Sequence, residues 1–305
     1  MRKEFIFPFF SCDLIKCMNR RSFLTNSILG TSTMATLTSF MNEMDGIKPS
    51  EEKMPVLFIG HGSPMNAIEQ NEYHNSWIEL GKKLPRPKAI LTISAHWLTR
   101  DTRVTAMERP KTIHDFGGFP KELFAQQYPA PGSPDFAELT KKLVTKTSVQ
   151  SDFDWGLDHG TWSFLVPMYP QADIPVYQLS LDYYKPMQYH YELAKELAEL
   201  RTKGVMVIGS GNIVHNLRML NFSGQSYDWA IEFDQRMKEF IADQNHQAIV
   251  QYEKLGSIAK LAVPTHDHYL PLIYSIALHE KNEQVCFFNE KTDMGAVSMR
   301  SFRIG

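Results

Sequence analysis

Short runs of apolar, often β-branched residues alternate with amphipathic stretches along the chain from Met54 onward. Uninterrupted apolar runs of this length are typical of strands that are buried on both faces of a parallel sheet. We predict strands at residues 56–59, 89–93, 176–181, 205–208 and 285–288. The alternation indicates α/β architecture, with one domain over residues 54–305 and a central, largely parallel sheet flanked by helices.

Helix signals lie between these runs. Ser133, Pro134 and Asp135 supply a capping residue, a first-turn proline and a first-turn acid, which together predict a helix start. Elsewhere, apolar residues recur at three- and four-residue spacing, as on a helix face that packs against a core. These stripes are Leu193, Leu197 and Leu200, and Trp229, Phe233, Met237 and Phe240.

Residues 1–53 do not share this pattern. Arg20 and Arg21 precede an uncharged stretch from residue 22 to residue 42 that is rich in Ser and Thr. This arrangement resembles a twin-arginine export signal, with Met18 as an alternative start of the protein. We therefore expect export to the periplasm. The alternatives are a disordered tail on a cytoplasmic protein and an uncleaved membrane anchor.

Composition narrows the classes of function. The 305 residues include 32 Lys and Arg against 34 Asp and Glu, without a long run of one sign. This balance argues against nucleic acid or a membrane surface as partner and leaves a small molecule, with the oligomeric state open. Three cysteines exclude a disulfide scaffold and a zinc site built from several cysteines. A metal would need histidine and carboxylate ligands.

Four of the eleven histidines come within a few residues after apolar runs. His61 and His96 follow the first two predicted strands, His215 comes shortly after residues 205–208, and His268 comes after a shorter run at 261–263. Ligands of open α/β sheets bind at the carboxyl ends of the strands, so we expect these histidines to converge there. Neutral imidazoles suit iron(II) or zinc. Spacing alone leaves His266 as an alternative to His268.

The other histidines divide into two groups. We expect four of them, in helical or charged surroundings, to face solvent: His74, His190, His246 and His279. Two loops have a chemical character instead, one with His159 and one with His114 and Asp115. The second loop is rich in turn residues and could cover a pocket, although a packed structural loop is an alternative for both.

Seven motifs in order resemble one family. They are GHGSP at 60–64, SAHW at 94–97, HDFGGFP at 114–120, GLDHGTW at 156–162, GSGNIVHN at 209–216, DHYLPL at 267–272 and SMRSF at 298–302. Together they resemble the class III extradiol ring-cleaving dioxygenases, in particular the 4,5-DOPA extradiol dioxygenase branch. The resemblance covers the whole of residues 54–305.

The resemblance implies one divalent metal ion, with iron(II) for turnover or zinc(II) as bound, and dioxygen as co-substrate. His61, His96 and His268 would be the metal ligands. His215 would act as acid and base beside the metal, and as a fourth ligand when zinc is bound. His159 would contact the substrate and assist proton transfer. The loop with His114 and Asp115 would also contact the substrate.

The implied reaction inserts both atoms of dioxygen into a catechol and opens the ring to a muconic semialdehyde. Many class III relatives have a glutamate as third ligand where this chain has His268. His266 and Asp267 also replace a more usual proline and glutamate. Two alternatives remain at this point: a zinc-dependent hydrolase, and a non-enzymatic metal-site binding protein of the same superfamily.

Overall fold

The computed structural model describes residues 53–305. The twin-arginine motif and Met18 lie outside the described residues. Within residues 53–305, no helix combines the length and the apolar character needed to cross a membrane.

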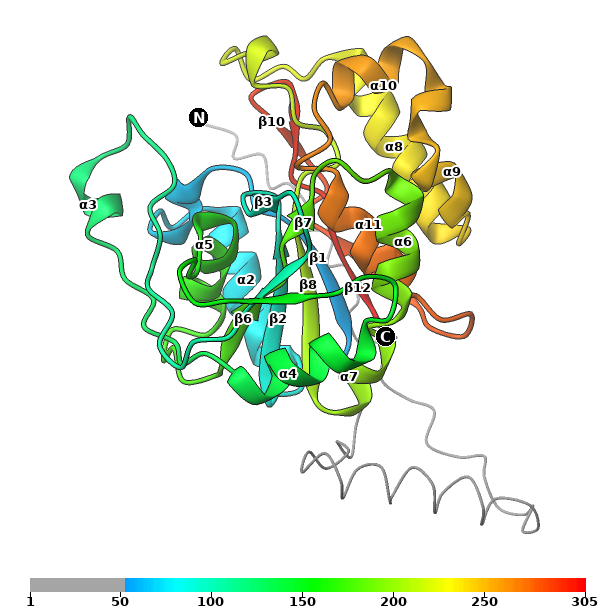
Figure 1. Cartoon of the computed structure of the whole chain (residues 1–305). Coiled ribbons are helices and arrows are strands. Elements are labelled where there is room, and N and C mark those ends of the chain that lie inside the picture. The colour runs from blue at the N-terminus through cyan, green and yellow to red at the C-terminus, as the bar shows by residue number, and fades with distance from the viewer. Residues whose placement is uncertain (1–52) are drawn as a thin grey trace, which may run out of the picture. The chain divides into compact units, whose positions relative to one another are not determined.

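A mixed six-stranded sheet lies at the centre of the described chain (Figure 1). Four strands are parallel to one another, and the fifth pairs antiparallel with its neighbours on both sides. In spatial order the strands are β6 (Val176–Gln178), β2 (Ala89–Ser94), β8 (Val205–Gly211), β1 (Val56–Gly60), β12 (Ser301–Ile304) and β9 (Val285–Phe288).

Helices cover both faces of this sheet, and the two faces belong to separate apolar clusters. On β1, Val56 and Phe58 face one cluster, and Leu57 and Ile59 face the other. The second cluster is covered by α2 (Glu72–Lys83) and α5 (His159–Met168). The first is covered by α4 (Pro134–Leu143), α6 (Met187–Lys195), α7 (Ala198–Thr202), α8 (Asp228–Ala242), α9 (His246–Val250), α10 (Ser257–Ala262) and α11 (Leu270–Ala277).

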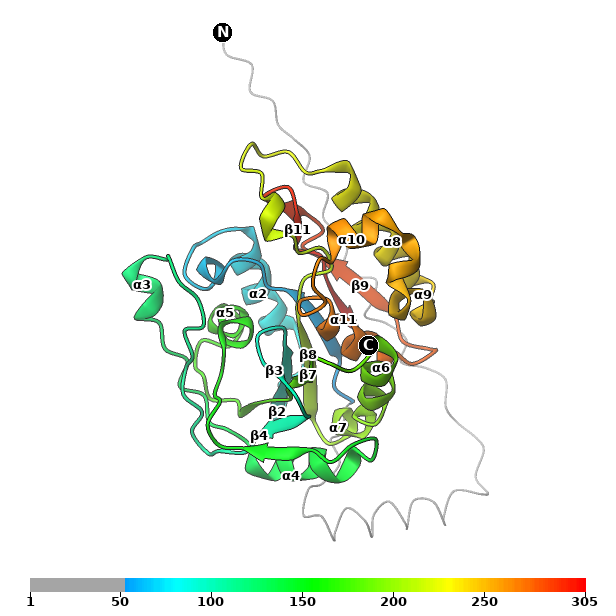
Figure 2. The same ribbon diagram turned by 45° about the horizontal axis from the view of Figure 1, so that its top comes forward.

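Short elements complete the described chain (Figure 2). Three pairs of short strands lie outside the main sheet: β3 (Leu98–Thr99) with β7 (Leu181–Asp182), β4 (Arg103–Thr105) with β5 (Gln150–Asp152), and β10 (Thr292–Asp293) with β11 (Val297–Ser298). The short helices are α3 (Lys121–Phe124) and the 3-10 turns η2 (Pro64–Ala67), η3 (Leu217–Met219) and η4 (Tyr252–Leu255).

The predicted α/β architecture is confirmed, with local corrections. The run 176–181 breaks because the chain leaves β2 after Gln178 and pairs with β3 from Leu181 onward. The run 261–263 is not a strand, since it contains the end of α10. The stripe from Leu193 to Leu200 spans two helices, α6 and α7, rather than one. The pattern did not predict β12.

The expectation that four histidines face solvent is wrong. His190 is fully buried on α6, and its Nδ1 lies 3.0 Å from the hydroxyl of Tyr274. His279 is also buried, with its Nε2 3.1 Å from the carbonyl oxygen of Glu283. His74 and His246 are half-buried. Each of the two buried rings finds a polar partner inside the fold, so burial does not leave it wholly unsatisfied.

Candidate active site

Two parallel strands bring His61 and His96 together. β1 ends at Gly60 and β2 ends at Ser94, on either side of the central strand β8. The backbone N–H of His61 donates to the carbonyl of Gly211 at the end of β8, so the pairing continues into the histidine. Gly62 then turns the chain with a φ of 60°, a conformation that favours glycine. Both histidines therefore stand at the carboxyl edge of the sheet.

His268 reaches the same edge from the connection between α10 and α11. The backbone N–H of Asn212 donates to the His268 carbonyl at 2.9 Å. A Cβ atom on Gly211 would lie only 2.1 Å from that carbonyl oxygen, so this approach requires glycine at position 211. Contact with the end of β8 therefore holds His268 at the edge of the sheet, although His268 does not itself follow a strand.

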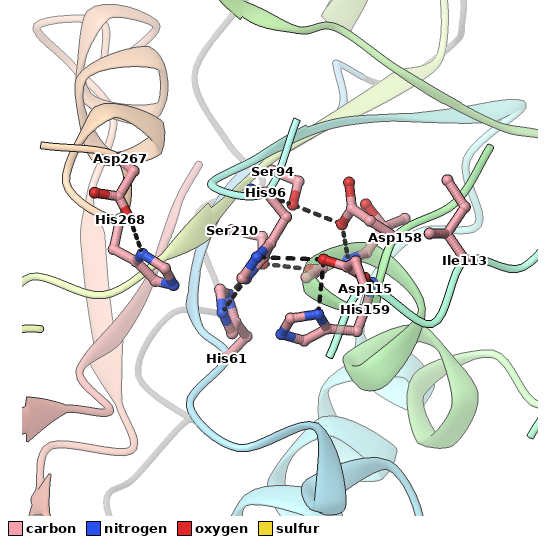
Figure 3. A network of polar contacts seen from close by, with 12 residues as sticks. His61, Ser94, His96, Ile113, Asp115, Asp158, His159, Ser210, Asp267 and His268 are labelled. Atoms are coloured by element: carbon pink, nitrogen blue, oxygen red, sulfur yellow. Dashed lines mark hydrogen bonds and ion pairs between the residues drawn. The ribbon is translucent and has the colours of Figure 1, made fainter. Parts of the chain in front are cut away.

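The three rings form a cluster with the geometry of a metal site (Figure 3). One ring nitrogen from each of His61, His96 and His268 lies within 4.8 Å of the others. The Nε2 atoms of His61 and His96 are 3.2 Å apart. Two nitrogens bound to one ion at about 2.1 Å stand about 3.0–3.4 Å apart in octahedral or tetrahedral geometry. The observed separation fits this value.

Hydrogen bonds orient two of these rings, His61 and His268, so that the Nε2 lone pair of each points into the cluster. The single hydroxyl proton of Ser210 is donated to the carbonyl of Gly160, so Ser210 must accept from Nδ1–H of His61, at 3.0 Å. Nδ1–H of His268 donates to Oδ2 of Asp267 at 2.5 Å. In the neutral form of each ring, Nε2 is then free of a proton, as a metal ligand must be.

Two rings of the cluster, His61 and His96, are also held neutral. Burial lowers the pKa of His61 and of His96 well below the ordinary histidine value, and the neighbouring histidines lower both further. Two unprotonated nitrogens that face each other at 3.2 Å repel unless a cation lies between them. The donor set therefore suits a divalent ion such as iron(II) or zinc.

The start of α5 adds a fourth ring and one carboxylate, and the loop that contains Asp115 adds a second carboxylate. Asp158 caps the helix and is fully buried, with Ser94 Oγ donating to it at 2.6 Å. His159 follows directly, and its ring centroid is 3.9 Å from that of His96. Asp115 reaches both rings: its Oδ2 is 3.0 Å from His159 Nδ1 and 3.3 Å from His96 Nδ1 (Figure 3). His159 and Asp115 thus join the histidine cluster.

Burial acts on both carboxyl groups, with different results. It raises the pKa of Asp158, and the charge of Asp115 raises it further. Burial also raises the pKa of Asp115, but the hydrogen bond and charge of His159 outweigh it, so the pKa falls below the ordinary aspartate value. Asp115 is therefore an anion beside two imidazoles.

His215 lies next to the cluster. Its ring stacks on that of His268 with centroids 3.5 Å apart and planes at 9°. The backbone N–H of His215 donates to the carbonyl of Ala262, and the flanking residues pair with the segment around Val297. Burial, followed by the charge of His268, lowers the pKa of His215 to about 3. The ring is thus neutral at neutral pH and able to accept a proton.

Two other candidates face elsewhere. The His266 ring stacks on Tyr183, and its Nε2 lies 3.0 Å from the Tyr183 carbonyl, so His268 and not His266 enters the cluster. Nε2 of His114 lies 2.9 Å from the carbonyl of Gln126, and the ring packs against Trp162. In this structure His114 fixes its own loop and does not contact the clustered histidines.

Several contacts were not predicted from the sequence. Ser94, Asp158, Ser210 and Asp267 all bond to, or support, a ring of the cluster. The adjacency of Asp267 to His268 was a usable signal. Ser94 and Ser210 carry no signal of their own, because their meeting depends on the register that pairs β2 with β8.

Comparison with known proteins identifies the family. The family model described as the catalytic LigB subunit of aromatic ring-opening dioxygenase matches residues 55–294. The chain belongs to this family. It is an oxidoreductase of the extradiol ring-cleaving class, and this membership argues against both the hydrolase and the non-enzymatic alternative.

Curated relatives and a crystal structure agree with this family. A protein of Escherichia coli K12 named 4,5-DOPA dioxygenase extradiol is 47% identical, with 84% of this chain and 96% of the relative covered. A Beta vulgaris protein of the same name is 35% identical, and the match covers 86% of this chain and 98% of the relative. The crystal structure of an uncharacterised protein from Escherichia coli K12 has 43% identity and a TM-score of 0.74, with 83% and 100% covered.

Proposed function

We propose that this dioxygenase depends on one divalent metal ion bound by His61, His96 and His268. The observation that carries the proposal is the cluster of three rings, two of which are oriented by Ser210 and Asp267 so that Nε2 points into the cluster. Iron(II) or zinc(II) bound there would act as a Lewis acid on the substrate hydroxyls, and iron(II) would serve turnover with dioxygen.

We further propose a catechol as substrate, with DOPA or a similar aromatic diol as the first compound to test. Two relatives carry this substrate in their names. Three neutral ligands would leave the charge of a divalent ion to be balanced by a doubly deprotonated catechol. Phe116 stands edge-on to His159, with ring centroids 5.5 Å apart, and offers an aromatic contact at the site.

His215 and His159 would move the protons. His215 is neutral and stacked beside His268, so it can take a proton from a substrate hydroxyl. Nδ1 of His159 faces Asp115, which leaves its Nε2 to contact the substrate and to hold or return a proton. Ring opening next to the diol would then give a muconic semialdehyde.

Oxygen uptake tests this proposal. The chain is loaded with iron(II) without oxygen and then mixed with oxygen and substituted catechols, and a ring-opened product is followed by its absorption. His215→Ala should lose turnover by about 10²–10⁴-fold while iron(II) binding, which the three other histidines provide, remains within about tenfold of the wild type. Hydrolysis without oxygen uptake, or full turnover in His215→Ala, would refute the assignment.

We also propose export through the twin-arginine pathway, on the basis of Arg20 and Arg21 before an uncharged stretch. Fractionation of cells that express the full chain, with R20K/R21K as the matched variant, tests this. Periplasmic wild type and cytoplasmic variant would support export, whereas equal cytoplasmic location of both would contradict it.

A further inference from the structure

One carboxylate contacts two histidines that have different proposed tasks. Oδ1 of Asp115 accepts the backbone N–H of His159 at 2.9 Å, at the first turn of α5. Oδ2 lies 3.0 Å from His159 Nδ1 and 3.3 Å from His96 Nδ1 (Figure 3). The Asp115 side chain is 17% exposed. Both of its oxygens are thus engaged by nitrogen atoms of the protein.

This geometry sets the protonation pattern of both rings. An ionised carboxylate only accepts hydrogen bonds, and one oxygen has lone pairs for two donors. A bare Nδ1 lone pair 3.0–3.3 Å from the charged Oδ2 would be repelled, so Nδ1 of His96 and Nδ1 of His159 would both carry the proton, although His159 Nδ1 makes no well-aligned hydrogen bond. In the neutral form of each ring, Nε2 is then bare. In His96 that nitrogen is the one 3.2 Å from Nε2 of His61.

We propose that Asp115 is a positioning residue that fixes the tautomer and orientation of His96 and His159 together. This inference rests on the proposed function, because it assigns metal binding to His96 and proton transfer to His159. It replaces the substrate contact that the family resemblance implies for Asp115. Loss of the carboxylate should then weaken metal binding and proton transfer at the same time.

The same atoms allow a competing interpretation. One atom each of His96, Asp115 and His159 lie within 4.8 Å of one another, which is also the arrangement of a metal-binding group. Asp115 would then be a ligand of a second ion and not a hydrogen-bond acceptor. The two interpretations differ in metal stoichiometry and in the proton positions of the zinc-bound protein, since Nδ1 of His96 and of His159 would be bare if they were ligands of a second ion.

Asp115→Asn separates helix capping from ring orientation. The single amide oxygen can still accept the His159 backbone N–H, so α5 keeps this bond. The amide NH₂ then faces the two ring Nδ1 atoms and can only donate to them. The matched control is Asn245→Ala, which removes a side-chain bond to Ala248 N–H at the start of α9, a helix that contributes no residue to the cluster.

The experiment uses three readouts on the full chain. Histidine-selective ¹⁵N NMR of the zinc-bound protein reports which ring nitrogen carries the proton, because Nε2 of His61 and Nε2 of His96 can both be bare when an ion lies between them. Chelator competition gives the zinc affinity, and elemental analysis gives the zinc stoichiometry. Kinetics with iron(II) and a catechol separate kcat from KM.

We expect Nδ1–H tautomers of His96 and His159 in the wild type and at least one Nε2–H tautomer in Asp115→Asn. Zinc affinity should fall by about 10–100-fold, and kcat by about 10²–10⁴-fold with KM within about twofold. Asn245→Ala should match the wild type in all readouts.

Unchanged tautomers and zinc affinity in Asp115→Asn would overturn the proposal. So would a fall from two bound zinc ions to one, since Asp115 would then be a ligand. If the wild type turns over no catechol, the proposed function fails, yet the tautomers and zinc affinities still decide the role of Asp115.

Discussion

A single methyl group at position 160 should disable the site. Gly160 lies in the first turn of α5, and a Cβ atom there would meet Ser94 Oγ at 2.4 Å and His96 Cδ2 at 2.9 Å. Ordinary contact begins at about 3.4 Å, so the His96 ring must retreat by about 0.5 Å and the Ser94 hydroxyl by about 1 Å. Metal–ligand distances tolerate only about 0.2 Å.

We therefore expect Gly160→Ala to lower zinc affinity by at least about tenfold and kcat by about 10²-fold, because small misplacements of reacting groups are costly. Overpacking should also lower the free energy of unfolding by about 1–3 kcal/mol. The assays are chelator competition, oxygen uptake with a catechol and urea denaturation.

Two glycine variants separate the site effect from the stability effect. Gly81→Ala would place Cβ at 2.2 Å from the carbonyl oxygen of Met168, at the far end of α5, so it should lose stability but keep zinc affinity. Gly117→Ala meets nothing within 4 Å and should change neither. Wild-type zinc affinity in Gly160→Ala, or an equal loss of zinc affinity in Gly81→Ala, would show that the packing of Gly160 against His96 does not control metal binding.

Three further predictions concern other parts of the described chain. Ser210→Ala leaves Nδ1 of His61 without its acceptor and should lower zinc affinity by about 10–100-fold in chelator competition; an unchanged affinity would contradict the tautomer argument. Asp234→Asn breaks the buried ion pair with Arg300, whose Nε and Nη2 lie 2.9 and 2.6 Å from Oδ2 of Asp234. The free energy of unfolding, measured by urea denaturation, should fall by about 3 kcal/mol. A loss below about 1 kcal/mol would show that the fold does not need this pair. Burial lowers the pKa of His190 to about 4, so between pH 6.5 and about 4 the unfolded chain takes up a proton that the folded chain refuses. The contribution of His190 to the free energy of unfolding should be fully present above pH 6.5 and should fall by up to about 3 kcal/mol toward pH 4. The free energy of unfolding should decrease less steeply with falling pH in His190→Gln. An equal slope in both proteins would exclude His190 as the cause.

The sequence pattern predicted most reliably those site residues that directly follow strands of the main sheet. His61 and His96 follow β1 and β2, and the rule that parallel strands end at one edge was enough to bring them together. His268 reaches the cluster for a different reason. The apolar run before it is helical, and the hydrogen bond from Asn212 N–H to the His268 carbonyl holds it at the edge of the sheet. Spacing could not choose between His266 and His268, because the difference is the direction of each ring.

The hydrogen-bond partners of the clustered histidines could not be predicted from the sequence pattern. Ser210 acts on His61 only because β8 lies between β1 and β2 in one register. Likewise, Asp115 reaches His96 and His159 only because the loop after residue 113 folds back to the start of α5. The buried His190 was misjudged because charged neighbours on α6 suggested an exposed position, whereas its partner Tyr274 lies 84 residues away.

The central claim is that His61, His96 and His268 bind one divalent ion. Zinc per chain, measured by elemental analysis after saturation and removal of free metal, tests it most directly with His268→Ala and its neighbour His266→Ala as a matched pair. We expect one zinc per chain in the wild type and in His266→Ala, and strong loss of zinc in His268→Ala. Zinc that remains in His268→Ala but is lost in His266→Ala, or a wild type that binds none, would contradict it.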